Sequence, residues 1–314
     1  MDPEAVTVEK LYKPLWCYRT LRRVCANHSH AIIHQHTVPI HSALWPVCAA
    51  AGRKVKTVFS DYDPPTSLSG KFRGSKKWLK RSMRSMRIYP DWIAPVSEFN
   101  ARVWETHFGH ERIRPIRHGV IAPDHVPVRS TPRGRCWRVA FIGRMMWNKG
   151  VREVIQAAEL ARQSHLPVHF DIYGDGPQAS YIRESIANQN LIDICTYHGS
   201  SRGMDRVYAA ADIVLVPSQF NDPCPMVSLE AMSFGVPAIY SNRGGIPECQ
   251  VDGETGIMME CGTALEINNA LKEMIGNPDR YKLMSLSARR RYEESFTMDR
   301  MVDDYMRLYL ELLQ

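Results

Sequence analysis

Short apolar runs alternate with amphipathic stretches throughout the second half of the chain. The runs predict β-strands, at residues 138–142, 168–173, 194–197, 213–216, 238–241 and 256–259. The amphipathic stretches predict helices at residues 151–164, 178–188 and 204–210, with a further helix from about Pro225. Buried strands that alternate with helices are typical of a parallel sheet covered on both faces, so this half is predicted to be an α/β domain.

The first half of the chain has a less regular pattern. It predicts helices at residues 10–27, 40–51 and 99–107 and strands at residues 31–36, 55–59, 92–96 and 112–117. Residues 121–136 contain three prolines and one glycine, which is typical of a linker. We therefore predict a first domain at residues 1–122, a linker at 123–136, a second domain at 137–296 and a terminal helix at 297–314.

The terminal helix carries its apolar side chains on one stripe, which ordinarily marks a packing face. The stripe consists of Met298, Met301, Val302, Tyr305, Leu308, Tyr309 and Leu312.

Motifs with glycine and polar residues follow the predicted strands of the second half, at the ends where parallel sheets bind ligands. They are Gly143-Arg144, Gly174-Asp175, Gly199, Pro217-Ser218 and Asn242. Their convergence on one rim of the sheet predicts a binding site there.

The densest cluster of such signals lies between Pro217 and Gly256. Asp222 and Glu230 are eight residues apart, with Asp222 in the loop before a helix and Glu230 inside it. The N-terminus of a helix has unpaired N–H groups and a partial positive charge, so it is a natural seat for a phosphate. Carboxylates beside that seat suit the hydroxyl groups of a ribose and a hexose.

Composition narrows the class of protein. A chain of 314 residues that is 44% hydrophobic and 23% charged is predicted to be soluble and globular, with room for two domains. It has no apolar run of 18 residues, and its start lacks the features of a signal peptide. Eight scattered cysteines without a C-x-x-C pair argue against a disulfide framework or a structural zinc site, so we expect a cytoplasmic protein. The net charge of +7 favours an anionic partner.

Residues 217–256 closely resemble the donor-binding core of the retaining glycosyltransferases of family 4, also called glycosyl transferases group 1. The family's pattern there is a serine-rich strand end, E-x7-E, L-E-A-M-x-x-G-x-P and G-G-x-P-E. The resemblance extends upstream to residues 143–144, 149–150 and 173–177, and it covers residues 138–260 strongly and 30–120 more weakly. It implies a GT-B fold, in which two Rossmann-like domains face each other across a cleft and the terminal helix packs back on the first domain.

The resemblance also implies an activity. The chain is expected to move a sugar from a nucleotide-diphosphate sugar of the UDP or GDP type to a glycan or lipid-linked acceptor. The anomeric configuration would be retained, without an enzyme nucleophile, a cofactor or a metal. The departing phosphate itself would guide the acceptor hydroxyl on the same face.

Four charged residues receive roles from the resemblance. Arg144 and Lys149 would stabilise the diphosphate, where fixed cations lower the energy of the transition state. Glu230 would hold the ribose hydroxyls, and Asp222, one methylene shorter than the family's glutamate, would contact the sugar. A charged helix start is the alternative interpretation for Asp222 and, taken alone, for Arg144 and Lys149.

The remaining donor-site candidates act through backbone or short side chains. N–H groups of Met226 and Val227 should face the diphosphate, and Ser218 either binds near the donor or is an ordinary turn residue. The backbone candidates that bring the chain close to the ligand are Gly143, Gly174, Gly244 and Gly245. Arg243 is a weaker phosphate candidate, and Glu248 a helix-start charge.

Histidines in the first half include an H-x-H pair on one strand face, His34 and His36. No cysteine or carboxylate nearby completes a metal site, so we favour a place in the family's interdomain cleft. The family also has a histidine after the next strand, beside the transferred sugar. Here Tyr62 stands in or next to that position, with Asp61 and Asp63 on either side, and we keep Asp61 and Tyr62 as catalytic candidates.

A basic stretch between Lys71 and Arg87 contains no acidic residue. Basic and apolar positions alternate in it, so it fits either an anionic membrane surface or a solvated face. No recognised nucleic-acid motif accompanies the stretch, so nucleic acid is not an expected partner.

One departure from the family concerns the first domain. The opening βα unit with a glycine-rich loop has no counterpart, and about two βα units of roughly 30 residues each are missing. We therefore expect a shortened first domain and keep two alternatives to a transferase. One is a nucleotide-sugar epimerase or hydrolase of the same architecture, and the other a non-catalytic remnant or a chain that needs a protein partner to complete its first domain.

Overall fold

The structure is a computed structural model of the chain, and it describes residues 23, 31–36, 55–62, 90–108, 112–123, 126, 131–132 and 135–314. It divides into two compact units. Unit 1 comprises residues 1–116 and 304–314, and unit 2 comprises residues 117–303. The functional domains predicted with limits at 122, 136 and 296 stay a prediction. The helices predicted at residues 10–27 and 40–51 and the basic stretch at 71–87 lie outside the described residues, apart from residue 23.

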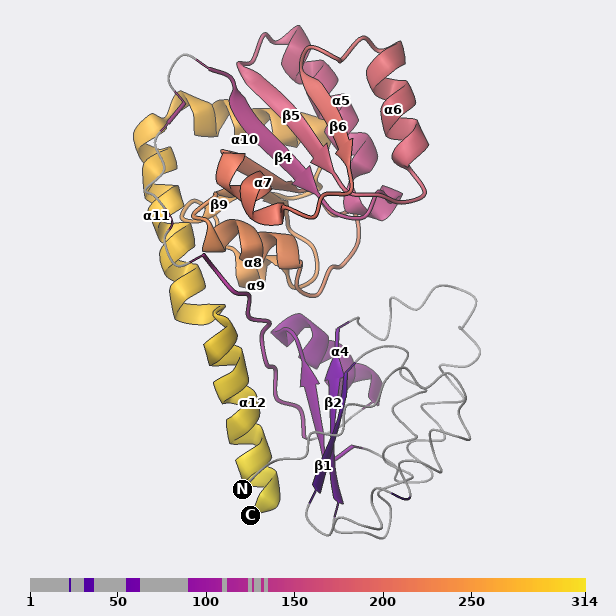
Figure 1. Cartoon of the computed structure of the whole chain (residues 1–314), viewed down its shortest axis with the longest axis vertical. Helices are drawn as coiled ribbons and strands as arrows, with labels where there is room; N and C mark the ends of the chain where they lie inside the picture. The colour runs from indigo at the N-terminus through magenta and orange to yellow at the C-terminus, as the bar shows by residue number, and fades with distance from the viewer. Residues whose placement is uncertain are drawn as a thin grey trace. The chain divides into compact units, whose positions relative to one another are not determined.

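Unit 2 contains a parallel six-stranded sheet with the order β6-β5-β4-β7-β8-β9 (Figure 1). Its strands are β4 (Trp137–Ile142), β5 (Val168–Tyr173), β6 (Cys195–Gly199), β7 (Ile213–Val216), β8 (Ala238–Ser241) and β9 (Gly256–Met259). The chain runs outward from β4 to β6, then returns to the other side of β4 at β7. Such a reversal of strand order opens a crevice at the carboxyl ends of the two central strands, where ligands bind in sheets of this type.

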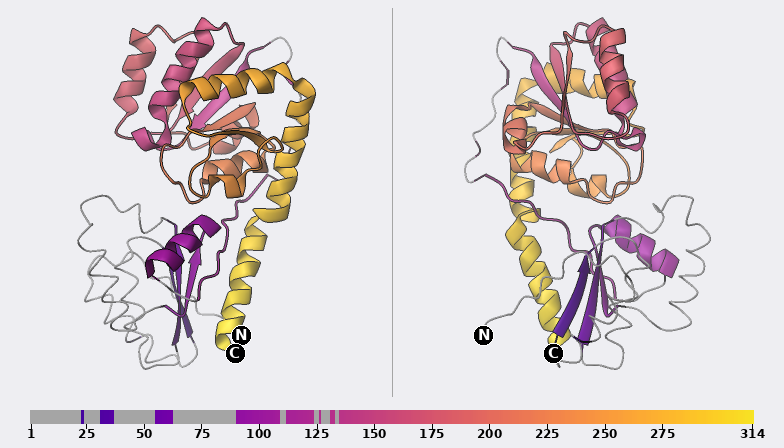
Figure 2. Two further views of the ribbon diagram at one scale, coloured as in Figure 1. Left: turned by 180° about the vertical axis from the view of Figure 1, so that it is seen from behind. Right: turned by 45° about the vertical axis from the view of Figure 1, so that its right-hand side comes forward.

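Helices cover both faces of this sheet (Figure 2). One face is covered by α5 (Val151–Gln163), α6 (Ala179–Asn188) and α10 (Ala264–Gly276), whose apolar side chains share a cluster with the strands. A second cluster joins the opposite face to α7 (Met204–Ala210), α8 (Met226–Ser233) and α9 (Ile246–Cys249). Helix α11 (Pro278–Ser295) follows α10 along the chain.

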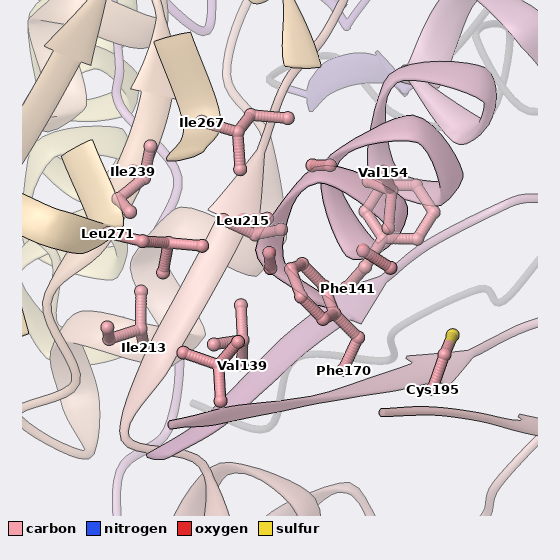
Figure 3. Packing of buried hydrophobic residues seen from close by; sticks show 14 of the residues in the cluster. Val139, Phe141, Val154, Phe170, Cys195, Ile213, Leu215, Ile239, Ile267 and Leu271 are labelled. Carbon is pink, nitrogen blue, oxygen red and sulfur yellow. The ribbon is translucent and has the colours of Figure 1, made fainter. Parts of the chain in front are cut away.

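The larger core lies between the sheet and helices α5 and α10 (Figure 3). Phe170 and Leu215 from the strands meet Val154 from α5 and Ile267 and Leu271 from α10, and all five side chains are at most 1% exposed. Fully burying one such side chain contributes about 1.5–3 kcal/mol. Uninterrupted apolar strands are what a sheet buried on both faces requires, and this confirms the α/β character predicted for the second half.

The predicted strands of unit 2 agree with the structure closely. Four of them, residues 168–173, 213–216, 238–241 and 256–259, have the predicted limits, and β4 begins one residue earlier than predicted. The strand predicted at 194–197 is present at Cys195–Gly199, and it ends two residues later than predicted because it continues past polar residues that the apolar pattern excluded.

The described part of unit 1 contains a parallel three-stranded sheet in the order β1-β2-β3, and a helix follows β3 along the chain. These elements are β1 (Ala31–His36), β2 (Val55–Asp61), β3 (Trp92–Pro95) and α4 (Glu98–Phe108). They confirm the predicted strands at 31–36, 55–59 and 92–96 and the helix at 99–107 to within two residues.

The strand predicted at residues 112–117 is wrong, since the structure has only a single bridge there, between Ile93 and Ile113. Arg114 N donates to Ile93 O at 2.9 Å and Ile116 N to Pro95 O at 2.9 Å, as in a parallel ladder. Completing the next bridge requires an N–H from Pro95, which has none. Proline at the end of β3 therefore stops the ladder after one rung.

The last helix, α12 (Met298–Leu313), begins where the sequence predicted. Leu308 and Leu312 are buried, at 0% and 7% exposure, and they belong to the predicted packing stripe. Val302 was wrongly assigned to that stripe, because its side chain is 47% exposed. Among the described residues, no helix has both the length and the apolar character needed to cross a bilayer.

Candidate active site

The carboxyl ends of the strands in unit 2 are tied together by backbone hydrogen bonds between their loops. Gly143 N, after β4, donates to Tyr173 O at the end of β5 at 3.0 Å. Gly174 N donates in turn to Gly199 O at the end of β6 at 2.8 Å. The predicted motifs at these three strand ends are therefore neighbours on one rim of the sheet.

The loop after β4 is pressed against the loop after β7. It contains a short 3-10 helix, Trp147–Lys149, which ends at Gly150 with φ +87°. A Cβ on Gly150 would lie 2.2 Å from Pro217 O, so only glycine allows this approach. Gln219 N also donates to Asn148 O at 2.8 Å, and together these contacts carry Lys149 across to β7.

Lys149 and Asp222 form an ion pair at this junction. Lys149 Nζ lies 2.6 Å from Asp222 Oδ2, and the two side chains are 31% and 7% exposed. The ammonium group also lies 4.7 Å from the centre of the Phe220 ring, a cation–π distance. Sequence analysis assigned the two residues to different parts of the donor, and the structure places them in direct contact.

The Gly-Gly loop after β8 wraps the backbone of Asp222. Gly244 has φ +60°, and a Cβ on it would lie 2.5 Å from Asp222 O. Gly245 N donates to the same carbonyl oxygen at 2.8 Å. Arg243, in the same loop, has a buried Nε that makes no hydrogen bond within the described part of the chain. A guanidinium N–H without a partner is a feature that a bound anion would satisfy.

Helix α8 begins at this junction. Pro225 is its N-cap, and Met226 and Val227 are its first two helical residues. Their N–H groups have no acceptor inside the helix, since an α-helix leaves its first amides unpaired. The positive end of α8 thus follows directly after the Lys149–Asp222 pair.

Glu230 lies one turn into α8 and is half-buried. Its Oε2 accepts a hydrogen bond from the hydroxyl of Tyr208 on α7. Glu230 and Met226 lie in the wall of a cavity of about 280 Å³ that α7 and Val120 also line. The resemblance gave Glu230 the ribose hydroxyls as partners, and the structure adds a protein partner.

Three other predicted donor-site residues differ in their exposure and contacts. Arg144 is exposed and forms no hydrogen bond or ion pair with another described residue. Ser218 is 2% exposed, and its carbonyl accepts from Ser241 Oγ at 2.8 Å. Glu248 lies in the first turn of α9, as the helix-start interpretation predicted.

In unit 1, His34, His36 and Tyr62 lie in one cluster of hydrogen bonds and ring contacts. His34 Nε2 lies 2.7 Å from Ser60 Oγ, and His34 Nδ1 contacts the hydroxyl of Tyr309. The His36 and His34 rings have centres 3.8 Å apart and planes inclined by 36°, and His36 hydrogen-bonds to Tyr62. Burial, and then the neighbouring His36, lower the pKa of His34 to about 3, so its ring is neutral near pH 7.

Asp61 has a different environment from Tyr62. Its side chain is 4% exposed, and Oδ2 accepts from Trp104 Nε1 at 2.8 Å. This contact joins β2 to α4 inside unit 1. The catalytic roles expected for Asp61 and Tyr62 stay predictions.

Sequence analysis did not single out Tyr208, Phe220 or Gln219, although each contacts a predicted site residue or its loop. Tyr208 lies beside Val207 on the buried face of α7, and a buried hydroxyl there indicates a hydrogen-bond partner. Cys224 and Cys249, which lie beside the same loops, are free thiols with their Sγ atoms 3.6 Å apart.

The sequence profile of the Glycosyl transferases group 1 family matches residues 129–291 of this chain. That match covers the whole of the rim described above. The chain belongs to the glycosyl transferases group 1 family. The resemblance seen in the motifs is thereby confirmed.

Similarity to individual proteins agrees with this assignment. The chain is 24% identical over 247 residues to a glycogen synthase of Mycobacterium tuberculosis, covering 78% of this chain and 58% of that protein. It is 28% identical over 167 residues to N-acetyl-alpha-D-glucosaminyl L-malate synthase of Bacillus anthracis, covering 53% of this chain and 43% of that protein. The matched part is thus about half the length of these relatives.

Two solved structures share the fold. A glycosyltransferase from Rickettsia africae has a TM-score of 0.76 at 16% identity, covering 98% of this chain and 83% of that chain. Anabaena Alr3699/HepE, solved in complex with UDP-glucose, has a TM-score of 0.76 at 16% identity, covering 94% and 82%. This likeness confirms the GT-B fold class predicted from the sequence.

Proposed function

We propose that unit 2 binds a nucleotide-diphosphate sugar and that the chain transfers the sugar to a glycan or lipid-linked acceptor with retention of configuration. The observation that carries the proposal is the Lys149–Asp222 ion pair directly before the first turn of α8. The pair sets a cation and a carboxylate shortly before, along the chain, a helix whose first amides have no acceptor inside the helix.

This arrangement matches the charge that develops during glycosyl transfer. Breaking the bond between sugar and phosphate leaves negative charge on the departing diphosphate. The amides of Met226 and Val227 and the ammonium of Lys149 are held in place before the reaction, so they stabilise that charge without reorganising. Arg144, which is exposed and unpaired with described residues, supplies a second cation from the loop after β4.

The two carboxylates support retention without an enzyme nucleophile. Asp222 is paired with Lys149, and Glu230 with Tyr208. In the proposed reaction Asp222 orients the sugar, Glu230 accepts hydrogen bonds from the ribose, and the departing phosphate receives the proton of the acceptor hydroxyl. This chemistry requires no metal, and we propose a metal-independent hexosyl transfer.

Names of relatives support the substrate class. HepE has been solved with UDP-glucose, and TarM with UDP. We extend this to a UDP or GDP sugar as the donor of this chain. Contacts of the basic residues 71–87 with an anionic membrane, and a protein partner that completes the first domain, belong to the same proposal.

A thermal-shift panel tests donor binding, because a ligand that binds only the folded state raises the melting temperature. UDP, GDP and their glucose and mannose conjugates should include one that stabilises the full chain at micromolar concentration. No shift with any of them would reject the proposal.

Product analysis then separates transfer from its alternatives. The anomeric proton signal of the product, followed by NMR after reaction with a glycan acceptor, should show the configuration of the donor. Release of free sugar or an epimer from donor alone would instead favour the hydrolase or epimerase.

A further inference from the structure

We infer that Tyr208 is the residue that positions Glu230 for ribose, and that it makes the site discriminate ribonucleotides from nucleotides without ribose hydroxyls. The inference rests on the proposed function, because it concerns the nucleoside end of the same site. It begins with the only hydrogen bond recorded for the Glu230 carboxylate within the described residues, which comes from the Tyr208 hydroxyl.

Tyr208 is fixed on its own helix. Its side chain is 1% exposed, within the apolar cluster between α7, α8 and the sheet. The ring stacks on Phe234 with centres 5.6 Å apart and planes inclined by 27°. A tyrosine packed in this way has little freedom to turn, so its hydroxyl defines one position in space.

The hydroxyl acts as a donor. Burial, and then the charge of Glu230, raise the pKa of Tyr208 above its ordinary value, so the phenol keeps its proton at neutral pH. A protonated phenol beside a carboxylate donates to it, and such charge-assisted bonds are stronger than neutral ones. Because Oε2 of Glu230 accepts this bond, one of the two carboxylate oxygens has a fixed place.

Fixing Oε2 leaves Oε1 for a ligand. Within the described residues Oε1 accepts no hydrogen bond, and Glu230 is one of the residues that line the cavity of about 280 Å³. Ribose presents two adjacent hydroxyls, which suit a carboxylate held in a single orientation. Without Tyr208 the glutamate would change rotamer freely, and ordering it would cost free energy on binding.

The matched variants are Tyr208→Phe and Tyr281→Phe. Tyr281 is also fully buried, at 0% exposure, and its hydroxyl also donates a hydrogen bond, to Asp212 O at 3.0 Å. It does not line the cavity at Glu230. Any effect of losing a buried phenol hydroxyl in general should appear in both variants, and an effect through Glu230 only in the first.

The experiment is calorimetric titration of the full chain with UDP and GDP and with their 2′,3′-dideoxy analogues. We expect Tyr208→Phe to weaken binding of the preferred ribonucleotide about tenfold, the order of one lost hydrogen bond to a charged group. Binding of the dideoxy analogue should change by about twofold or less, and Tyr281→Phe should leave both affinities unchanged.

Equal weakening of both ligands by Tyr208→Phe, or no weakening, would overturn the inference while leaving donor binding established. Failure of the wild-type chain to bind any of the four ligands would reject the proposed function itself. A double-mutant cycle with Glu230→Gln guards against general destabilisation, since the loss from Tyr208→Phe should vanish in that background. A full loss from Tyr208→Phe in the Glu230→Gln background would also overturn the inference.

Discussion

Replacing Lys149 by methionine should separate the contribution of the Lys149–Asp222 pair to stability from its contribution to nucleotide binding. Methionine keeps most of the aliphatic stem and removes the ammonium group. Asp222, at 7% side-chain exposure, then becomes a buried carboxylate without its cation. Breaking a fully buried pair costs about 3–5 kcal/mol. Since the Lys149 side chain is 31% exposed, water already screens part of the interaction with Asp222. We therefore expect Lys149→Met to lower the free energy of unfolding by about 2 kcal/mol.

The second variant, Lys149→Met with Asp222→Asn, removes the stranded charge. Its stability should recover most of the loss, because a neutral amide is cheaper to bury than an unpaired carboxylate. Differential scanning fluorimetry measures this directly, since about 2 kcal/mol corresponds to a shift of about 4–8 °C in a domain of this size. Lys272→Met, an exposed lysine on α10, is the control and should leave the melting temperature unchanged.

Nucleotide binding, unlike stability, should not recover in the double variant. Both Lys149 variants lack the cation that the proposed function assigns to the diphosphate, so each should bind UDP or GDP about 10- to 100-fold more weakly than wild type. Stability is thus rescued by the second substitution and binding is not. Full binding in the double variant, or an unchanged melting temperature in Lys149→Met, would refute the assigned roles.

Three further changes probe separate parts of the account. Gly150→Ala places a Cβ 2.2 Å from a carbonyl oxygen at φ +87° and should cost more than about 2 kcal/mol by denaturant titration, whereas Gly276→Ala, with no atom within 4 Å of its added Cβ, should cost nothing. Arg144→Ala should lower kcat/KM about 10²–10³-fold with no change in melting temperature; normal turnover would exclude Arg144 from the site. His34 has a pKa of about 3 in the folded chain and an ordinary value of 6.5 in the unfolded chain, so below pH 6.5 protons bind the unfolded chain preferentially. The free energy of unfolding should therefore fall by about 2 kcal/mol between pH 7 and 5, and by less in His34→Gln. If His34→Gln lost as much stability between pH 7 and 5 as wild type, His34 would not be held neutral in the folded chain. His165→Gln, which changes an exposed histidine, is the control and should behave like wild type.

The sheet of unit 2 was predictable because burial on both faces leaves a signal in each strand separately. Apolar runs such as residues 213–216 need no partner to be recognised. The strand predicted at residues 112–117 failed for the opposite reason. Whether Ile113 continues a ladder depends on an N–H of Pro95 in another segment, and a local pattern contains no such information.

Helices α10 and α11 were absent from the predicted elements although both begin with clear signals. Thr263 and Glu266 form a capping box, and Asn277 caps the helix that starts at Pro278. Such caps mark the start of a helix independently of its apolar period.

The candidate site was predictable as a list of residues but not as a set of contacts. Strand ends placed Lys149, Asp222 and Glu230 on one rim. The ion pair joins residues 73 positions apart in the chain, and its geometry depends on Gly150 packing on Pro217. Tyr208 was not predicted because a tyrosine on the buried face of an amphipathic helix looks like ordinary core until the neighbouring carboxylate is placed.

Hydrogen-exchange mass spectrometry of the full chain, with and without UDP-glucose and GDP-mannose, tests the central claim most directly. The account predicts slower exchange in the bound state at residues 143–150, 217–230 and 242–246, the three loops that meet at the start of α8. Protection confined to other segments, or no protection with either sugar nucleotide at saturating concentration, would contradict a diphosphate site at that helix.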